Sequence, residues 1–295
     1  MKLWTKICAF GIVILLGGVV IQLLWSGRSA MWHYGWQFLL QSAWNPVRGE
    51  FGILPRLYGT IVTSLLALVM AAPVGLATAL WLSVAPSGWL GAVINSGIEL
   101  LAAIPSVVYG LWGIFVLIPW LTPHLQWLHR HGGWLPFFAT PFPGRSLLVA
   151  ALVLAVMILP TIVALSRVAI SNVPGELIWG ALALGATPWE VLLAVALPYS
   201  RSGIIAAILL ALGRALGETM AVTMLIGNSN TLSLSWLAPA DTIASLLANN
   251  FAEAGEQEIP ALMYAALVLL VLSLAVNLSG ELILGNGSLD RNQAD

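Results

Sequence analysis

Arg214 and Glu218 are the residues whose types and spacing most directly suggest chemistry. They are the only charged residues in the apolar stretch from Ser202 to about Ile226, which is long enough to span a bilayer. Arg214 follows Ser202 by about 18 Å at 1.5 Å per helical residue, close to the middle of a hydrocarbon core about 30 Å thick. Because residues four apart share a helix face, the stretch predicts two charges together near the membrane midplane.

Charged residues at this depth are costly and usually face the bundle interior or a water-filled path. An arginine in such a path can bind an anion through two parallel donors, and the nearby Glu218 would limit the affinity so that the anion can leave. Thr219 and Thr223 add possible hydroxyl donors, although threonine in a membrane helix more often bonds its own backbone. The sequence therefore predicts a substrate pathway at Arg214, Glu218, Thr219 and Thr223.

A structural ion pair between Arg214 and Glu218 is the alternative to a substrate pathway. Arginine before glutamate is the weaker order for such a pair on a helix. Gly213 and Gly217 also bracket Arg214 at the small-xxx-small spacing that allows another helix to approach, which an ion pair does not require. Both observations favour the pathway.

The composition requires a membrane around this helix. The 295 residues are 60% hydrophobic and 8% charged, against roughly 45–50% and 25% for a soluble domain. The net charge of -1 argues against nucleic acid as a partner. Charge-poor windows predict an all-α integral membrane protein, with residues 1–295 forming one transmembrane domain. Its six predicted spans are 7–26, about 60–82, about 100–121, one between Arg145 and Arg167, Ser202 to about 226, and about 260–280.

The first span is open to a second interpretation. Lys2 and Lys6 precede the apolar run like the basic region of a signal peptide. The run from Ile7 to Leu24 is longer than a signal peptide's apolar region, so we expect an uncleaved anchor that spans the membrane. Basic residues divide equally between the two sides of the predicted topology and do not set its orientation.

A second motif follows the fourth predicted span. A helix from about Gly175 to Leu184 is expected to end at Gly185, which can adopt a left-handed conformation. Thr187 then serves as an N-cap, with Pro188 at the first helical position and Glu190 completing a capping box.

This motif is too short to span a membrane. The apolar run from Leu177 to Trp189 lies between Glu176 and Glu190, and Pro198 is expected to end the second helix. Residues 172–200 therefore predict a short helix-turn-helix outside the hydrocarbon. A re-entrant or interfacial hairpin that packs only on its own protein remains the alternative.

The spacing of the motif resembles the EAA loop of ABC importer permeases. Gly185 is followed, after nine residues, by Val195-Ala196-Leu197-Pro198, while Trp179-Gly180-Ala181 stands where the family has Glu-Ala-Ala. The resemblance implies a type I ABC importer permease fold. It also implies a cytoplasmic coupling helix that docks on an ATPase subunit; the coupling residues it implies are Ala181, Gly185, Glu190, Leu197 and Pro198.

Three further segments resemble the phosphate permease family PstC. They are FGILPRLYGTIVTSLLAL (51–68), ELLAAIPSVVYGLWGIFVLIP (99–119) and GRALGETMAVTMLIGN (213–228). The resemblance implies an ATP-driven phosphate importer in the bacterial inner membrane, with both termini in the cytoplasm. The implied partners are a homologous second permease subunit, two ATP-binding subunits, a periplasmic phosphate-binding protein and membrane lipid.

The remaining motifs suggest no chemistry of their own. His124, His129 and His131 lack regular ligand spacing and favour a wet periplasmic loop (121–146) over a metal site. The chain has no Walker loop, so ATP and magnesium are expected on the partner ATPase, and we expect neither a cofactor nor an enzyme active site in this chain. Several tryptophans near predicted span ends are typical of interfacial anchors: Trp25, Trp32, Trp36, Trp120 and Trp127.

Two other functions remain open. In an ion-coupled secondary transporter of an anion, Glu218 would carry the coupling proton, but such folds usually have internal repeats, and this sequence shows none. A membrane scaffold without transport would leave the charges at the midplane unexplained.

Overall fold

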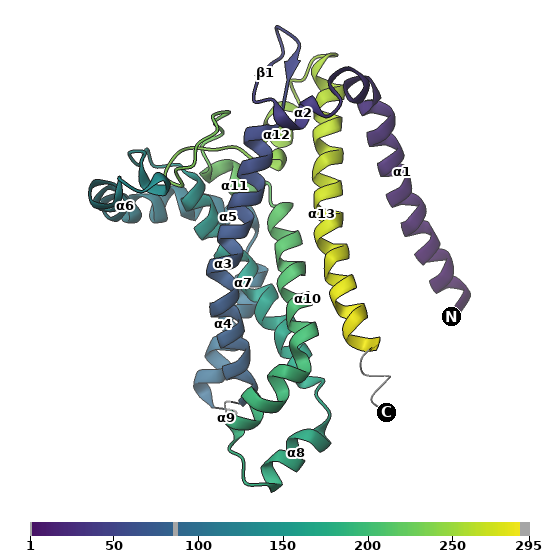
Figure 1. The fold of residues 1–295 in the computed structure, drawn as a ribbon, viewed down its shortest axis with the longest axis vertical. Coiled ribbons are helices and arrows are strands. Elements are labelled where there is room, and N and C mark those ends of the chain that lie inside the picture. The colour runs from purple at the N-terminus through teal and green to yellow at the C-terminus, as the bar shows by residue number, and fades with distance from the viewer. Residues whose placement is uncertain (1, 85–87, 290–295) are drawn as a thin grey trace.

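The computed structural model describes residues 2–84 and 88–289, and almost all of its regular structure is helical. The long helices α3, α7, α10 and α13 run side by side along the longest axis of the molecule, while α1 stands beside α13 (Figure 1). In chain order the elements are α1 (Lys2–Tyr34), α2 (Gln37–Leu40), β1 (Trp44–Asn45), β2 (Glu50–Phe51), α3 (Leu54–Val84), α4 (Trp89–Ala103), α5 (Ser106–Trp112), η1 (Gly113–Leu117), α6 (Ile118–Gly132), η2 (Pro136–Phe138), α7 (Leu147–Ser171), α8 (Gly175–Ala183), α9 (Pro188–Val191), η3 (Leu192–Ala196), α10 (Leu197–Leu216), α11 (Met220–Leu225), α12 (Ile243–Asn250) and α13 (Glu258–Leu289).

Six helices within the described residues are long and apolar enough to cross a membrane, which confirms the predicted number of spans. By length and composition they are Phe10–Tyr34, Leu54–Val84, Ser106–Gly132, Leu147–Ser171, Pro188–Leu216 and Glu258–Gly280. The third of these stretches is not straight: α4 and α5 run along the bundle, whereas α6, its second half, turns away from it (Figure 1). The protein is therefore a multi-pass membrane protein.

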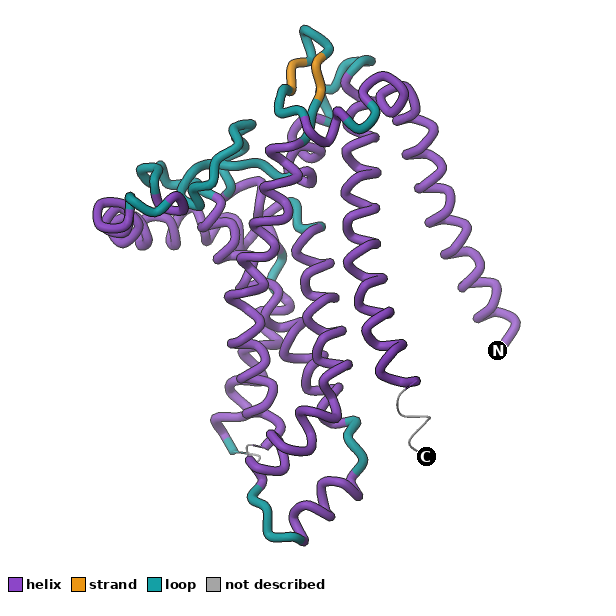
Figure 2. The backbone as a smooth tube through the Cα atoms, viewed as in Figure 1, coloured by secondary structure: helices purple, strands orange, loops and turns teal. Residues whose placement is uncertain are grey.

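The third predicted span, 100–121, is wrong in its bounds because the chain is broken there. Pro105 has no backbone N–H and forces Ile104 into extended backbone, so α4 ends before it and α5 begins after it. A π-helical turn, η1, follows α5. The next helix, α6, then leaves the bundle sideways (Figure 2).

The fifth predicted span, 202–226, begins too late and ends too late. Pro198 does not end the helix that starts at Pro188. A π-helical turn at Leu192–Ala196 accommodates the proline, and the helix continues to Leu216. Gly217 then ends α10, and α11 starts only at Met220. Arg214 and Glu218 therefore do not lie on one continuous helix, contrary to the prediction.

Small residues pack the centre of the bundle. Ala67 and Ala71 of α3 are buried against α7, and a Cβ at Gly75 would lie 2.8 Å from the Cγ2 of Ile162. Such small residues let helix backbones approach closely where lipid supplies little hydrophobic driving force.

The two ends of the bundle differ. One end carries the hairpin β1–β2, in which Trp44 pairs with Phe51, together with α2 and α12. The other end carries α8 and α9, and α1 and α13 both extend toward it from the hairpin end (Figure 1). The two candidate sites therefore lie at different positions along the axis of the bundle. They are the coupling motif and the charged break after α10.

Candidate substrate pathway and coupling surface

Arg214 lies in the last turn of α10, directly before the break in the fifth span. Glu218 lies in the break, where its Oε1 accepts a hydrogen bond from the backbone N–H of Ala221 at 3.4 Å. The carboxylate therefore caps the start of α11. Among the described residues, one ion pair forms, and it involves neither Arg214 nor Glu218. The geometry gives no support to a structural bridge between these two side chains.

The two threonines of the predicted pathway bond the backbone. The hydroxyl of Thr219 donates to the Gly217 carbonyl at 3.2 Å, and that of Thr223 donates to the Thr219 carbonyl at 2.7 Å. This is the behaviour expected of threonine in membrane helices. Their hydroxyl protons are thus used within the chain.

The glycines around Arg214 have different roles. A Cβ at Gly213 would lie 2.8 Å from the Oδ1 of Asn277, so this glycine allows close packing with α13. Gly217 has no such neighbour and instead ends the helix. Of the two glycines in the small-xxx-small pattern, Gly213 therefore makes an interhelical contact and Gly217 does not.

The helices that follow the two breaks, α5 and α11, pack on each other. A Cβ at Gly113 in η1 would lie 2.7 Å from Leu225 of α11, and the preceding helix α5 also packs on α11. The Tyr109 hydroxyl donates to the Leu101 carbonyl across the α4–α5 break at 2.8 Å. Two interrupted helices therefore pack together, and Arg214 lies at the end of the segment before the second break.

Interrupted backbone at membrane depth is tolerated where it is buried in protein or lines a water-filled cavity. The Arg214 side chain is exposed in the isolated chain. A charge that faced lipid would be costly, so this surface must face a partner subunit or water. That arrangement can contact a passing anion.

A buried ion pair near the hairpin end was missed by the sequence reasoning. Arg56 at the start of α3 donates through Nε to Oδ2 of Asp241 at 2.8 Å, and the two side chains are 7% and 6% exposed. Burial raises the pKa of the Asp241 carboxyl, and the Arg56 guanidinium opposes that rise. No pattern in the sequence pairs Arg56 with Asp241, because the two residues are 185 positions apart and meet only in the folded bundle.

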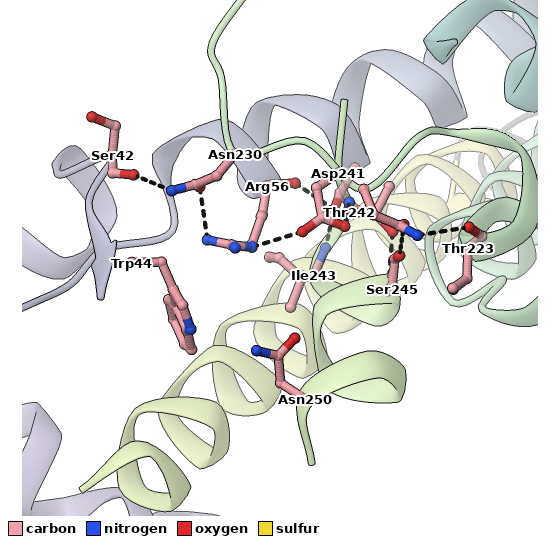
Figure 3. A network of polar contacts seen from close by, with 12 residues as sticks. Ser42, Trp44, Arg56, Thr223, Asn230, Asp241, Thr242, Ile243, Ser245 and Asn250 are labelled. Carbon is pink, nitrogen blue, oxygen red and sulfur yellow. Dashed lines mark hydrogen bonds and ion pairs between the residues drawn. The ribbon is translucent and has the colours of Figure 1, made fainter. Parts of the chain in front are cut away.

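The ion pair is part of a wider polar network (Figure 3). Arg56 also donates to Asn230, whose amide donates to the Ser42 carbonyl. On the other side, Ser245 donates to Asn228 at 2.8 Å, and Asn228 donates to the Thr223 carbonyl at 3.1 Å. The network thus extends from the start of α3 to α11, the helix directly after the break.

The predicted coupling motif forms as expected up to its second helix. Gly185 has φ +90°, the left-handed conformation that ends α8. The Thr187 side chain and the Glu190 side chain form the reciprocal capping box, with Pro188 at the first turn of α9. Ile178 of α8 packs against the cluster that contains Leu192, so α8 is held on the end of the fifth span.

The coupling motif presents large apolar side chains to its surroundings. Trp179, Leu184 and Trp189 are 71%, 91% and 47% exposed. Ala181 and Leu197 are half-buried, whereas Pro198 is exposed. Exposed apolar groups gathered at the end of a helix bundle mark a docking surface more often than a free surface.

A cavity of about 750 Å³ adjoins this motif, between α3, α4, α7 and the α8–α9 unit. Arg167 donates to Asn95 in its wall, and Asn95 donates to Glu99. The region 121–146, predicted as a loop, is helical in its first part, because α6 extends from Ile118 to Gly132. Among the described residues, no group of three histidine, cysteine or acidic side chains is placed to hold a metal ion.

Comparison with known proteins identifies the family to which this architecture belongs. Residues 71–285 match the family described as binding-protein-dependent transport system inner membrane component. The phosphate transport system permease protein PstC of Xylella fastidiosa (strain Temecula1) is 44% identical over 287 residues, 96% of this chain and 88% of the relative. The chain belongs to the PstC family. A probable PstC of Methanocaldococcus jannaschii is 33% identical over 95% of this chain and 94% of the relative.

Solved structures support the type I ABC importer permease fold for this PstC-family chain. A bacterial ABC transporter involved in import of the acidic polysaccharide alginate has a TM-score of 0.55 at 17% identity, covering 95% of this chain and 99% of that one. The MetNI methionine ABC transporter in an inward-facing conformation has a TM-score of 0.53 at 20% identity, covering 79% and 92%. At these identities the likeness shows the fold and not the substrate.

Proposed function

We propose that this chain is the permease subunit of an ATP-driven importer of inorganic phosphate and forms half of the translocation pathway. The observation that carries the proposal is the full-length similarity to phosphate transport system permease proteins, at 40–44% identity in several bacteria. Arg214 contacts the transported anion, because a guanidinium beside two helix breaks can replace part of the hydration of a phosphate anion. Glu218 limits how tightly that anion binds.

The partners follow from the family. The complex contains a homologous second permease subunit, two ATP-binding subunits that hold ATP and magnesium, and a periplasmic phosphate-binding protein. The second permease subunit covers the exposed Arg214 surface and completes the pathway. The α8–α9 unit docks on an ATP-binding subunit through Trp179, Leu184 and Trp189.

The structure suggests how movement at the docking surface reaches the pathway. The helix is continuous from Pro188 to Leu216, so Trp189 and Arg214 lie at opposite ends of one rod about 38 Å long. When the ATP-binding subunits close, they displace α9, and the continuous helix carries most of this displacement to Arg214. The π-helical turn at Leu192–Ala196 is the place where this rod can bend.

Docking of α8–α9 on an ATPase places that end of the bundle in the cytoplasm. Both termini then lie in the cytoplasm, and the hairpin β1–β2 and helix α12 lie in the periplasm. The protein spans the bacterial inner membrane in this orientation, so the buried network of Arg56 and Asp241 lies on the side from which phosphate enters.

Copurification tests the proposal. The tagged chain, expressed with its neighbouring subunits, should retain an ATP-binding subunit detectable by mass spectrometry. The reconstituted complex should hydrolyse ATP faster when the phosphate-loaded binding protein is added. Uptake driven by a proton gradient without any ATP-binding subunit would instead establish the ion-coupled secondary transporter.

A further inference from the structure

Helix α6 is a feature that the proposed transport mechanism does not use. After the π-helical turn η1 it leaves the bundle and extends sideways at the level of α5 and α11 (Figure 1, Figure 2). One face, with Leu121, Leu125 and Leu128, packs against Phe138 and Trp236. The segments that carry those two aromatic residues lie on the hairpin side of α6, so α6 is covered from that side.

Another face of α6 carries a stripe of alternating tryptophan and histidine. Trp120, His124, Trp127 and His131 follow at spacings of four, three and four residues, which place them on one helix face. The tryptophans are 64% and 60% exposed, and both histidines are exposed. The rings pair along the stripe, with centroids 5.2 Å apart for Trp120–His124 and 4.5 Å for Trp127–His131.

The hydrogen bonds of the two histidines fix which ring nitrogen remains available. Nδ1 of His124 lies 3.0 Å from the Trp120 carbonyl, and Nδ1 of His131 lies 2.9 Å from the Trp127 carbonyl. A carbonyl oxygen only accepts, so Nδ1 carries the proton in both rings. Each Nε2 of the neutral ring then carries a lone pair and can accept a hydrogen bond from an outside O–H or N–H group.

The charge around the stripe has one sign. Between Glu99 and Glu176 the sequence contains no aspartate or glutamate, whereas Arg130 lies on α6 itself and Arg145 follows in the covering loop. The acidic residues of the hairpin end lie on other segments, in the hairpin at Glu50 and between Asp241 and Glu258. The surface of α6 therefore complements an anion and not a cation.

We propose that the stripe Trp120–His124–Trp127–His131, together with Arg130, binds the headgroups of anionic phospholipids in the periplasmic leaflet, with α6 lying along the membrane surface. Tryptophan is enriched at this depth because its ring is apolar and its N–H is polar. A helix with an apolar aromatic face and basic residues is typical of an interfacial helix. Arg130 donates to the lipid phosphate, and the two Nε2 atoms accept from the hydroxyl groups of a headgroup such as that of phosphatidylglycerol.

The depth of α6 tests the proposal. Spin labels are placed on Trp127→Cys and, as a matched control, on Gln126→Cys, both in a Cys8→Ala background of the complete complex in nanodiscs with phosphatidylglycerol. Adjacent helix positions differ by about 100°, so we expect the label at 127 to be reached by oxygen and the label at 126 by a water-soluble nickel complex. Equal access of the nickel complex to both labels would overturn the proposal.

Lipid retention tests the headgroup contact. The complex with His124→Ala and His131→Ala should retain several-fold less phosphatidylglycerol after detergent purification, measured by mass spectrometry. Arg130→Gln should lower retention by about fivefold, which corresponds to the contribution of about 1 kcal/mol that one basic residue makes at an anionic surface. The control is His33→Ala, an exposed histidine outside α6, which should retain the wild-type amount.

Three results would contradict lipid as the occupant. Unchanged phosphatidylglycerol in the double variant would show that the stripe makes no headgroup contact. Release of the lipid by millimolar inorganic phosphate would assign the stripe to the free anion. Photocrosslinking of position 127 to the periplasmic binding protein would assign it to that protein.

Discussion

The Nε of Arg56 donates to Oδ2 of Asp241 across 2.8 Å, although the two residues are 185 positions apart in the sequence. The contact joins the first turn of α3 to the loop before α12, and Gly59 on the same face of α3 leaves room for the Asp241 carbonyl. Both charged groups are nearly excluded from solvent, so the loss of either leaves the other buried without compensation.

This ion pair gives the first prediction. Asp241→Ala should destabilise the protein by about 3–5 kcal/mol, the range for removing one partner of a buried pair. Glu253→Ala, which removes an exposed carboxylate from the same end of the bundle, is the control and should have little effect. Denaturation of the purified chain in mixed micelles measures both; equal stability of the two variants would show that the pair is not structural.

The turn between α8 and α9 gives the second prediction. A Cβ at Gly185 would meet no atom within 4 Å, so the cost of a side chain there comes from the positive φ alone. Gly185→Val should therefore misplace α8 at a cost of about 1–2 kcal/mol, whereas Gly185→Asn should be tolerated better because asparagine visits this conformation. Phosphate-stimulated ATPase activity should fall in the valine variant while insertion continues.

Gly180→Ala is the control for this turn, because Gly180 is helical and also has open space around its Cα. Alanine favours the helix, so coupled ATPase activity should remain at the wild-type level. Unchanged activity in Gly185→Val would contradict the assignment of α8–α9 as the coupling unit.

The exposed tryptophan of α8 gives the third prediction. Trp179→Ala removes a side chain that is 71% exposed, so the stability of the isolated chain should hardly change. Its loss should weaken copurification of the ATP-binding subunit, because large aromatic side chains dominate interface energies. Trp32→Ala, which removes a 91% exposed tryptophan near the opposite end, is the control, and equal ATPase retention in both variants would argue against docking at α8.

The orientation of the bundle gives the fourth prediction. Cysteines at Ser171 and Asn249, both exposed in the structure, are introduced in a Cys8→Ala background. In intact spheroplasts an impermeant maleimide should label only the Asn249 position, because α12 lies in the periplasm in the proposed topology. Labelling of Ser171 alone would reverse the orientation and remove α8 from the reach of the ATPase.

The sequence predicts those parts of the fold that depend on local interactions. The six spans follow from apolar length, and the capping box of Thr187 and Glu190 follows from a spacing of three residues. The left-handed Gly185 is likewise a local requirement of the turn. Each of these features is decided by neighbours in the chain.

The parts that could not be predicted depend on how distant segments pack. A proline predicts a helix end, but Pro198 is accommodated by a π-helical turn, whereas Pro105 does break its helix. The break at Gly217 places the Glu218 carboxylate on the N–H of Ala221, so this side chain, which was predicted to share one helix face with Arg214, lies in the break instead. The contact between Arg56 and Asp241 has no local signal, since its partners are brought together only by the folded bundle.

The measurement that tests the central claim most directly is ATP-driven phosphate uptake by proteoliposomes, normalised to the amount of assembled complex. The variant with Arg214→Gln and Glu218→Gln keeps an acceptor for the Ala221 N–H, so it should assemble. Its uptake should fall at least about tenfold, or about 1.4 kcal/mol of lost stabilisation, while Arg214→Lys should recover part of the rate. Arg48→Gln, at an exposed arginine of the hairpin, should transport normally. Near-normal uptake by the double glutamine variant would contradict the claim that Arg214 contacts phosphate.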